Sequence, residues 1–225
     1  ESEKIIEGVL KEFSKLAGYP RPSHHEKAVS DYIAARLREL GLDPVQDEAW
    51  NVIADKAASP GYEDAPRVII QGHMDMVCVA EEGRSYDPLR DPIVLHRDGD
   101  ILSAEGTSLG ADDGVSEAIS FFLLQQEISH GPLRFIFTVD EEVSMTGALN
   151  LDPKYVEDAQ YIINCDSEEY DVLTVGSAGS VHMDFSRSIH WQKVPSGCKA
   201  MDITVSGLIG GHSGESINEG KANAI

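Results

Sequence analysis

The sequence comprises 225 residues, 41% of them hydrophobic and 25% charged, which is typical of a globular protein. Its 39 acidic residues against 18 basic ones give a net charge of −21, which argues against nucleic acid as a partner because phosphates need a basic surface. It contains no run of about 18 apolar residues, so we predict no membrane-spanning helix. The three cysteines lack a C-x-x-C spacing and favour a reducing compartment. We therefore predict a cytoplasmic protein.

The first half of the chain predicts helices followed by strands. An amphipathic helix reaches about residue 18, and a second runs to about residue 41, with Ser23 and Glu26 forming its capping box. The stretch 43–56 predicts a strand pair at a sheet edge. The β-branched run in 67–71 then predicts a buried strand.

The second half alternates strands with helices. It predicts a hairpin with a turn at 97–100, a helix over 113–127, a strand over 133–139, a short helix near 147–151 and a strand over 160–164. This alternation favours an α/β fold with a mixed central sheet flanked by helices. Farther on, alternating apolar residues in 199–206 predict a half-buried strand, and 217–222 predicts the start of a helix.

Three of the predicted strands end in acidic residues, and one of them also carries a histidine. His73 and Asp75 follow the run 68–70, and side chains two apart on a strand point the same way. An acid in that position can hold the second ring nitrogen of a metal-binding histidine. The other two strand ends carry 140–142, Asp-Glu-Glu, and 166–169, Asp-Ser-Glu-Glu.

A fourth acidic group follows the glycine-rich segment 106–114, in which Asp112 and Asp113 open the predicted helix. Taken singly, each group has a simpler interpretation: an N-cap carboxylate for Asp112 and Asp113, and a solvated loop for 140–142. However, ligands of open α/β sheets bind outside the carboxyl ends of the strands, which would gather all four groups. One imidazole and several carboxylates predict a site for Zn²⁺ or Mn²⁺, and two ions suit the number of acids better than one.

Five motifs, in this order, resemble the di-zinc metallopeptidases related to glutamate carboxypeptidase and aminoacylase, most of all the aminoacyl-histidine dipeptidase branch (Xaa-His or carnosine-type hydrolases). The resemblance covers roughly residues 5–225. The motifs are QGHMDMV at 71–77, GTSLGADDG at 106–114, TVDEE at 138–142, NCDSEE at 164–169 and GGHSG at 210–214.

The resemblance implies a role for each site residue. His73 and Asp166 would bind one zinc ion, Asp112 would bridge to the second, and Glu142 would bind that second ion. Glu141 would act as general base, while Asp75 would orient His73. Mn²⁺ or Co²⁺ are expected substitutes for Zn²⁺. His212 would bind the substrate carbonyl or the oxyanion, although a histidine among glycines also fits a simple tight turn.

The resemblance also implies an architecture. Residues 1–186 would form the N-terminal part of the catalytic domain, and residues 187–225 the start of a smaller α+β lid domain through which the full-length protein forms a homodimer. Such enzymes place one more histidine on the second ion, far toward the C-terminus, and the sequence up to Ile225 shows no motif for it. The 225-residue chain is therefore expected not to turn over dipeptides.

The implied activity is metal-dependent hydrolysis of dipeptides, with Xaa-His dipeptides expected as the small peptide substrates. The metal ligands alone do not determine which kind of amide bond is hydrolysed, so an N-acyl amino acid deacylase and a carboxypeptidase remain alternatives. A catalytically inactive relative that serves as a binding protein is the alternative from another class.

Overall fold

The structure is a computed structural model that describes residues 2–167, 171–176, 179, 183, 185–210 and 218–221. The chain divides into two units, Glu1–Val175 and Gly176–Ile225. All regular helices and strands that follow belong to the first unit. The predicted domain boundary at residue 187 stays a prediction.

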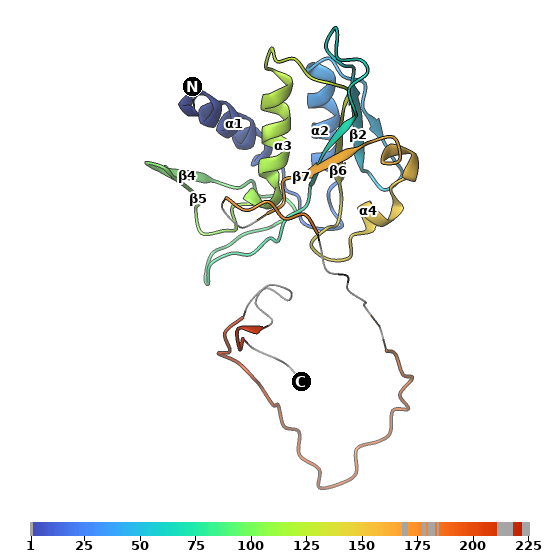
Figure 1. The fold of residues 1–225 in the computed structure, drawn as a ribbon. Coiled ribbons are helices and arrows are strands. Elements are labelled where there is room, and N and C mark those ends of the chain that lie inside the picture. Colours follow the sequence, from blue (N-terminus) through green and yellow to red (C-terminus); the bar gives the residue numbers. More distant parts are fainter. Residues whose placement is uncertain are drawn as a thin grey trace. The chain divides into compact units, whose positions relative to one another are not determined.

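The first unit is built on a five-stranded mixed sheet in the order β1-β2-β6-β3-β7 (Figure 1). Strands β1 and β2 pair antiparallel, β2 is antiparallel to β6, and β6, β3 and β7 run parallel to one another. The strands are β1 Val45–Gln46, β2 Val52–Lys56, β3 Val68–His73, β6 Leu133–Thr138 and β7 Tyr161–Asn164. The predicted α/β fold with a mixed sheet is confirmed.

The remaining elements surround this sheet. A separate hairpin, β4 (Leu95–Asp98) and β5 (Ile101–Ala104), turns at Gly99, whose φ of 58° suits glycine. The helices are α1 Ser2–Leu16, α2 Lys27–Glu39, α3 Ala111–Leu124, α4 Thr146–Asn150 and the 3₁₀ turn η1 Pro153–Tyr155. The predicted hairpin, the edge strand pair and the alternating helices and strands are thus confirmed.

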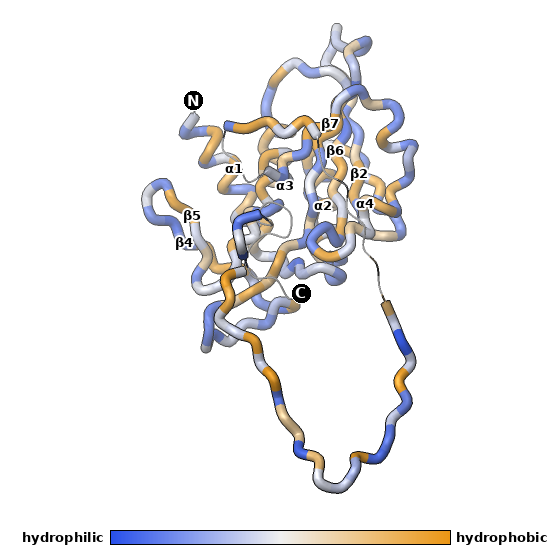
Figure 2. The backbone as a smooth tube through the Cα atoms, turned by 60° about the horizontal axis from the view of Figure 1, so that its bottom comes forward, coloured by the Kyte–Doolittle hydropathy of each residue, from blue (hydrophilic) through white to orange (hydrophobic). Residues whose placement is uncertain are grey.

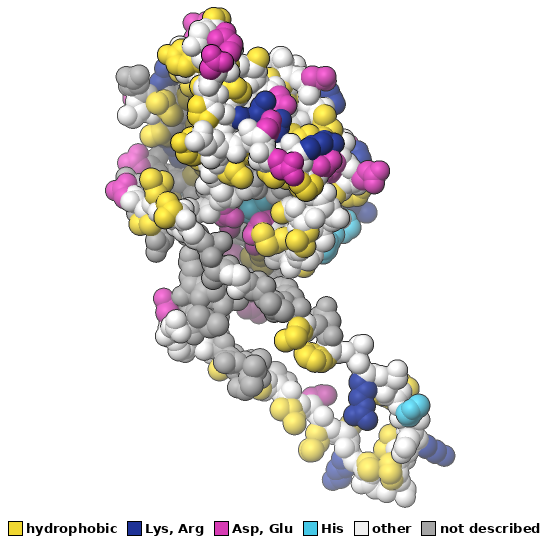
Figure 3. Space-filling view, turned by 45° about the vertical axis from the view of Figure 1, so that its right-hand side comes forward, with side chains coloured by type: hydrophobic (Ala, Val, Ile, Leu, Met, Phe, Trp, Pro, Cys, Tyr) yellow, Lys and Arg dark blue, Asp and Glu magenta, His cyan; other side chains and the backbone are white. Residues whose placement is uncertain are grey.

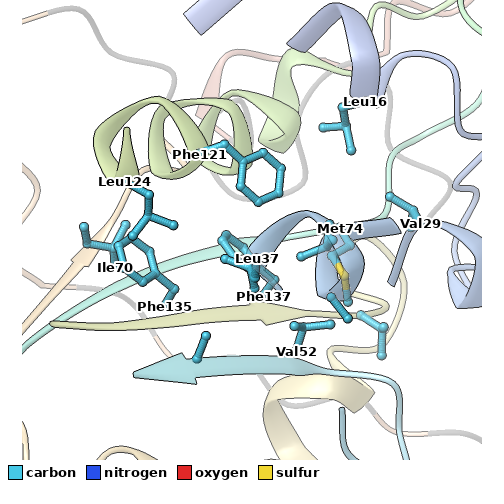
Figure 4. Packing of buried hydrophobic residues seen from close by; sticks show 14 of the residues in the cluster. Leu16, Val29, Leu37, Val52, Ile70, Met74, Phe121, Leu124, Phe135 and Phe137 are labelled. Atoms are coloured by element: carbon cyan, nitrogen blue, oxygen red, sulfur yellow. The ribbon is translucent and has the colours of Figure 1, made fainter. Parts of the chain in front are cut away.

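The main core lies between the sheet and the helices α1, α2 and α3 (Figure 4). It is formed by side chains from one face of the sheet together with apolar side chains of the helices. Phe121 of α3 and Phe135 and Phe137 of β6 are fully buried in it. Strand side chains of the other parity, Ile53, Ile69 and Ile136, form a smaller cluster on the opposite face with residues of the segment after α4. Side chains alternate between the two faces along a strand, so His73, four residues after Ile69, lies on this second face.

The second unit carries many exposed apolar side chains, and its tube alternates between orange and blue along the chain (Figure 2). Trp191 is 88% exposed and Ile203 is 90% exposed. The strand predicted over 199–206 is wrong, because these described residues form no ladder. An alternating pattern indicates which side chains could be buried, but it does not indicate which strand would form hydrogen bonds with the backbone. Within the described ranges no other strand pairs with this stretch. Of the helix predicted over 217–222, only 218–221 lie among the described residues, and they begin with a 3₁₀ residue followed by a turn.

Candidate metal centre

The site is centred on His73, the last residue of β3, whose side chain is 1% exposed. Its Nε2 atom lies 3.0 Å from Asp112 Oδ1, 3.8 Å from Asp166 Oδ2 and 3.9 Å from Glu141 Oε2. These carboxylates come from the start of α3, the segment after β7 and the turn after β6. The parallel register of β6, β3 and β7 brings their carboxyl ends to one edge of the sheet.

Two groups of potential ligand atoms overlap at His73. One joins His73, Glu141 and Asp166, and the other joins His73, Asp112 and Glu142; within each group the atoms lie within 4.8 Å of one another. The structure thus brings all four predicted ligands and the predicted base into one cluster. Figure 3 shows acidic and histidine side chains together in a recess of the surface.

Asp75 connects the histidine to the turn after β6. Its Oδ1 lies 3.3 Å from His73 Nδ1 and accepts a hydrogen bond from the backbone N–H of Glu141 at 3.0 Å, while its Oδ2 accepts one from the N–H of Glu142 at 3.2 Å. Burial alone would raise the pKa of Asp75, but His73 and these donors outweigh it and lower the pKa to about 2. Asp75 therefore stays ionised beside the imidazole and holds the backbone of the two glutamates.

Ser23 corrects the predicted capping box. Helix α2 begins at Lys27 with Glu26 at the N-cap and no side-chain cap, so Ser23 and Glu26 do not cap it. Instead the Ser23 hydroxyl donates to Asp75 Oδ2 at 2.7 Å, and Glu26 Oε1 accepts from the backbone N–H of Asp140 at 2.9 Å. Both polar side chains serve the site, which lies far from them in sequence.

The two adjacent aspartates at the start of α3 have different positions. The N-cap is Gly110, so neither acid is a simple N-cap. Asp112 is half exposed and faces His73, whereas Asp113 is 2% exposed and its Oδ2 accepts from the backbone N–H of His73 at 3.2 Å. The peptide bond between them is cis. The sequence placed Asp113 in the same acidic group as Asp112 but gave it no role of its own.

Gly72 allows this close approach of α3 to β3. A Cβ atom added to Gly72 would clash with the Ser116 hydroxyl and lie 2.6 Å from Asp113 Oδ2. The same hydroxyl donates to Asp113 Oδ2 at 2.8 Å. The glycine before His73 therefore admits the side chains that hold the start of α3 against the strand.

A second polar turn supports the glutamates. Asp140 is 1% exposed and has a left-handed φ of 57°. Its Oδ2 accepts hydrogen bonds from the hydroxyls of Ser144 at 2.7 Å and Thr146 at 2.6 Å. Asp140 was predicted only as one member of an acidic cluster; in the structure it shapes the turn and leaves Glu141 and Glu142 to face His73.

The concentration of acids shifts the pKa values of the site. Burial alone would lower the pKa of His73, but Asp75 and its acidic neighbours raise it to about 10. Burial raises the pKa of Glu141 and of Glu142, with Asp166 adding to the first effect and Asp112 to the second. Closely spaced carboxylates repel one another unless a cation compensates them. One imidazole nitrogen and several carboxylate oxygens, with an acid 3.3 Å from the second ring nitrogen, are a donor set that suits a divalent transition metal.

A pocket of about 220 Å³ opens beside the cluster on the second face of the sheet. Its polar lining includes Gln71, which donates to Thr138 and accepts from Asn164, and its apolar lining includes Ile69, Ile136 and Ile162. His73, Glu141 and Asp166 also line it. A small molecule in this pocket would lie next to the candidate base.

Glu117 is fully buried beneath the site, and its Oε1 has no hydrogen-bond partner among the residues that the structure describes. Burial, with Asp113 nearby, raises its pKa from the ordinary 4.5 to about 8. The folded protein thus keeps a proton that the unfolded chain releases above pH 4.5. The free energy of unfolding should accordingly fall as the pH rises from 4.5 toward 8.

Glu117→Gln should remove this cost, because the amide stays neutral. The quantity to follow is the urea concentration at the unfolding midpoint, compared between metal-free Glu117→Gln and metal-free wild type. We expect the variant's advantage over wild type to grow as the pH increases from 4.5 to 8 and to stay constant above that. Exposed Glu157→Gln serves as the control for the substitution itself. A constant difference for Glu117→Gln would contradict the assigned pKa shift.

His212 lies outside the described residues, so its predicted substrate contact stays a prediction. No helix among the described residues is long and apolar enough to cross a membrane.

Comparison with known proteins identifies relatives. No protein-family model matches the chain. The cytosol non-specific dipeptidase of Escherichia coli (strain K12) is 37% identical over 215 residues, which make up 94% of this chain and 44% of that protein. The crystal structure of aminoacylhistidine dipeptidase from Vibrio alginolyticus aligns with a TM-score of 0.69 at 38% identity, covering 72% of this chain and 33% of the other. Aminopeptidase PepT from Bacillus cereus aligns with a TM-score of 0.60 at 25% identity, covering 72% of this chain and 44% of the other.

Over most of its length the chain is similar to peptidases. It is similar in particular to the aminoacylhistidine dipeptidase, so the resemblance carried by the five motifs is confirmed. The chain spans less than half the length of these relatives.

Proposed function

We propose that this chain carries the metal-binding part of a dipeptidase that hydrolyses small peptides, with Xaa-His dipeptides as the preferred class. The observation that carries the proposal is the cluster around His73 Nε2, in which carboxylates from three other segments lie within 4 Å. The peptidase names of the relatives support the reaction class, and the aminoacylhistidine dipeptidase supports the substrate class.

Two zinc ions are the proposed cofactor, with Mn²⁺ or Co²⁺ as substitutes. His73, Asp112, Glu142 and Asp166 would hold them, and Asp75 would keep Nε2 of His73 aimed at the cluster. When bound, such ions polarise a substrate carbonyl and stabilise negative charge on its oxygen.

The protein residues would handle the proton. Glu141 would accept it from the attacking water and pass it to the departing amine nitrogen. The pKa of Glu141 is raised by burial and by Asp166, which brings a carboxylate closer to the range that suits a general base near neutral pH. His212 would bind the substrate carbonyl. We further propose a cytoplasmic homodimer, supported by the cytosolic relative for the location and by the family resemblance for the dimer.

The test uses the full-length gene product, loaded with zinc and assayed on β-alanyl-histidine, several α-dipeptides, N-acyl amino acids and longer peptides with a free carboxyl end. We expect dipeptide hydrolysis that a chelator removes and zinc restores. Faster hydrolysis of N-acyl amino acids would indicate a deacylase in place of a dipeptidase, and faster removal of the last residue from longer peptides would indicate a carboxypeptidase. Bound metal without hydrolysis of any of these amides would indicate a binding protein instead.

A further inference from the structure

Arg21 is buried between two of the segments that carry the site. It is 2% exposed and belongs to the connection between α1 and α2. Its Nη1 donates to the carbonyl oxygens of Met74 at 2.9 Å and Asp75 at 3.2 Å. Its Nη2 donates to the carbonyl oxygen of Gly110, immediately before α3. One guanidinium thus joins the end of β3 to the loop that presents Asp112.

The backbone of Arg21 is also bound to the strand end. The N–H of Met76 donates to the carbonyl oxygen of Arg21 at 3.1 Å, and Pro22 forms an isolated bridge with Met76. Arg21 is therefore bound to the residues after His73 through both its backbone and its side chain. Its reach to Gly110 then sets how far the α3 loop lies from the strand.

Two glycines of the 106–114 motif make room for this guanidinium. A Cβ atom added at Gly110 or at Gly114 would lie 2.6 Å from Arg21 Nη2. Gly110 also has a φ of 70°, which favours glycine by itself. Gly114 has no such conformation, so the space taken by Arg21 and its apolar neighbours accounts for glycine there. The two glycines flank Asp112 and Asp113.

The charge of Arg21 is compensated locally. Burial lowers its pKa, and the nearby acidic groups, among them Asp75 and Asp113, oppose this shift without reversing it. A planar guanidinium offers five donors in a fixed fork, whereas a lysine ammonium is a single compact charge on a flexible chain. Lysine could keep the charge at this position but could not hold three carbonyl groups in the same geometry.

We propose that Arg21 is a positioning residue that fixes the spacing between His73 with Asp75 on one side and Asp112 on the other. It touches no reacting atom, and it acts through the backbone of both ligand-bearing segments. The kinetic part of this inference rests on the proposed function, while its metal-binding part stands independently of the reaction.

The experiment compares Arg21→Lys and Arg21→Met with wild type in the full-length gene product. The readouts are Zn²⁺ affinity by competition with a chelating dye, the visible absorption spectrum of the Co²⁺ form, kcat and KM for a dipeptide, and the melting temperature. Arg134→Lys and Arg134→Met are matched controls. Arg134 is 6% exposed and is held by Asp55, Asp158 and the Tyr155 carbonyl, away from the cluster.

Both Arg21 variants should bind Zn²⁺ about 10–100-fold more weakly and change the Co²⁺ spectrum, since losses of this size follow removal of groups that orient metal ligands. Their kcat should fall by a similar factor with KM little changed. The Arg134 variants should lose melting temperature while keeping metal affinity, spectrum and kcat.

Metal affinity and spectrum unchanged in Arg21→Lys would overturn the positioning role, as would equal losses in the Arg134 controls. Arg21→Lys retains the buried charge, so it tests the role even if Arg21→Met does not fold. Wild type that binds metal but hydrolyses no peptide would refute the proposed function alone, because the metal readouts would still test Arg21. Wild type that binds no divalent metal would overturn both.

Discussion

Replacing Glu141 with glutamine should lower peptide turnover by about 10²–10⁴-fold, the usual contribution of a general base, while bound metal stays near the wild-type amount. Glutamine keeps the shape of the side chain but cannot accept a proton. The backbone N–H of Glu141, which holds the turn to Asp75, is unaffected by the change. Turnover should therefore fall without loss of the surrounding geometry.

Glu142→Gln is the matched control, because Glu142 is also held through its N–H by Asp75 and groups with Asp112 and His73. That variant should lose metal as well as activity. Metal content and kcat of both variants, measured on the full-length protein, check the assignment. Glu141 also groups with His73 and Asp166, so loss of metal in Glu141→Gln would make it a ligand and not the base.

Replacing His73 with glutamine should abolish metal binding and, with it, hydrolysis. His73 is the nitrogen donor shared by the group with Glu141 and Asp166 and the group with Asp112 and Glu142. Its loss would also leave the carboxylates of Asp75, Asp112 and Asp166 without their shared positive partner in metal-free protein.

The metal-free wild type should show this second effect as a pH dependence. A histidine whose pKa is raised to about 10 stabilises the fold fully below its unfolded value of 6.5, and this contribution disappears as the pH rises toward 10. The unfolding midpoint of His73→Gln should therefore not show this decrease as the pH rises from 6.5 toward 10. Exposed His96→Gln serves as the control, and zinc retained by His73→Gln would refute the proposed centre.

The sequence predicted the parts of this site that depend on strand ends. His73, Glu141 and Glu142 follow apolar runs, and parallel pairing of β3 and β6 necessarily brings their ends together. The apolar run before Asp166 likewise forms β7, parallel to β3. Local pattern and sheet geometry agree at these positions, so the prediction needed no knowledge of distant contacts.

The same reasoning failed where a side chain chooses a partner far away in the sequence. Ser23 has the spacing of a capping box but donates to Asp75, and no local signal distinguishes buried Asp113 from exposed Asp112. Arg21 stands between two prolines with no periodicity to mark it. The strand predicted over 199–206 failed for a related reason, because alternation does not specify which backbone would pair with it.

The hydrogen bonds that Asp75 accepts from the turn after β6 have a thermodynamic consequence. They fix the backbone of Glu141 and Glu142 relative to His73 when the protein folds, so the loss of backbone conformational entropy in this turn falls on folding and not on ligand capture. An ion entering such a cluster meets donors that already converge. This differs from small zinc domains, in which metal binding itself drives the chain to fold.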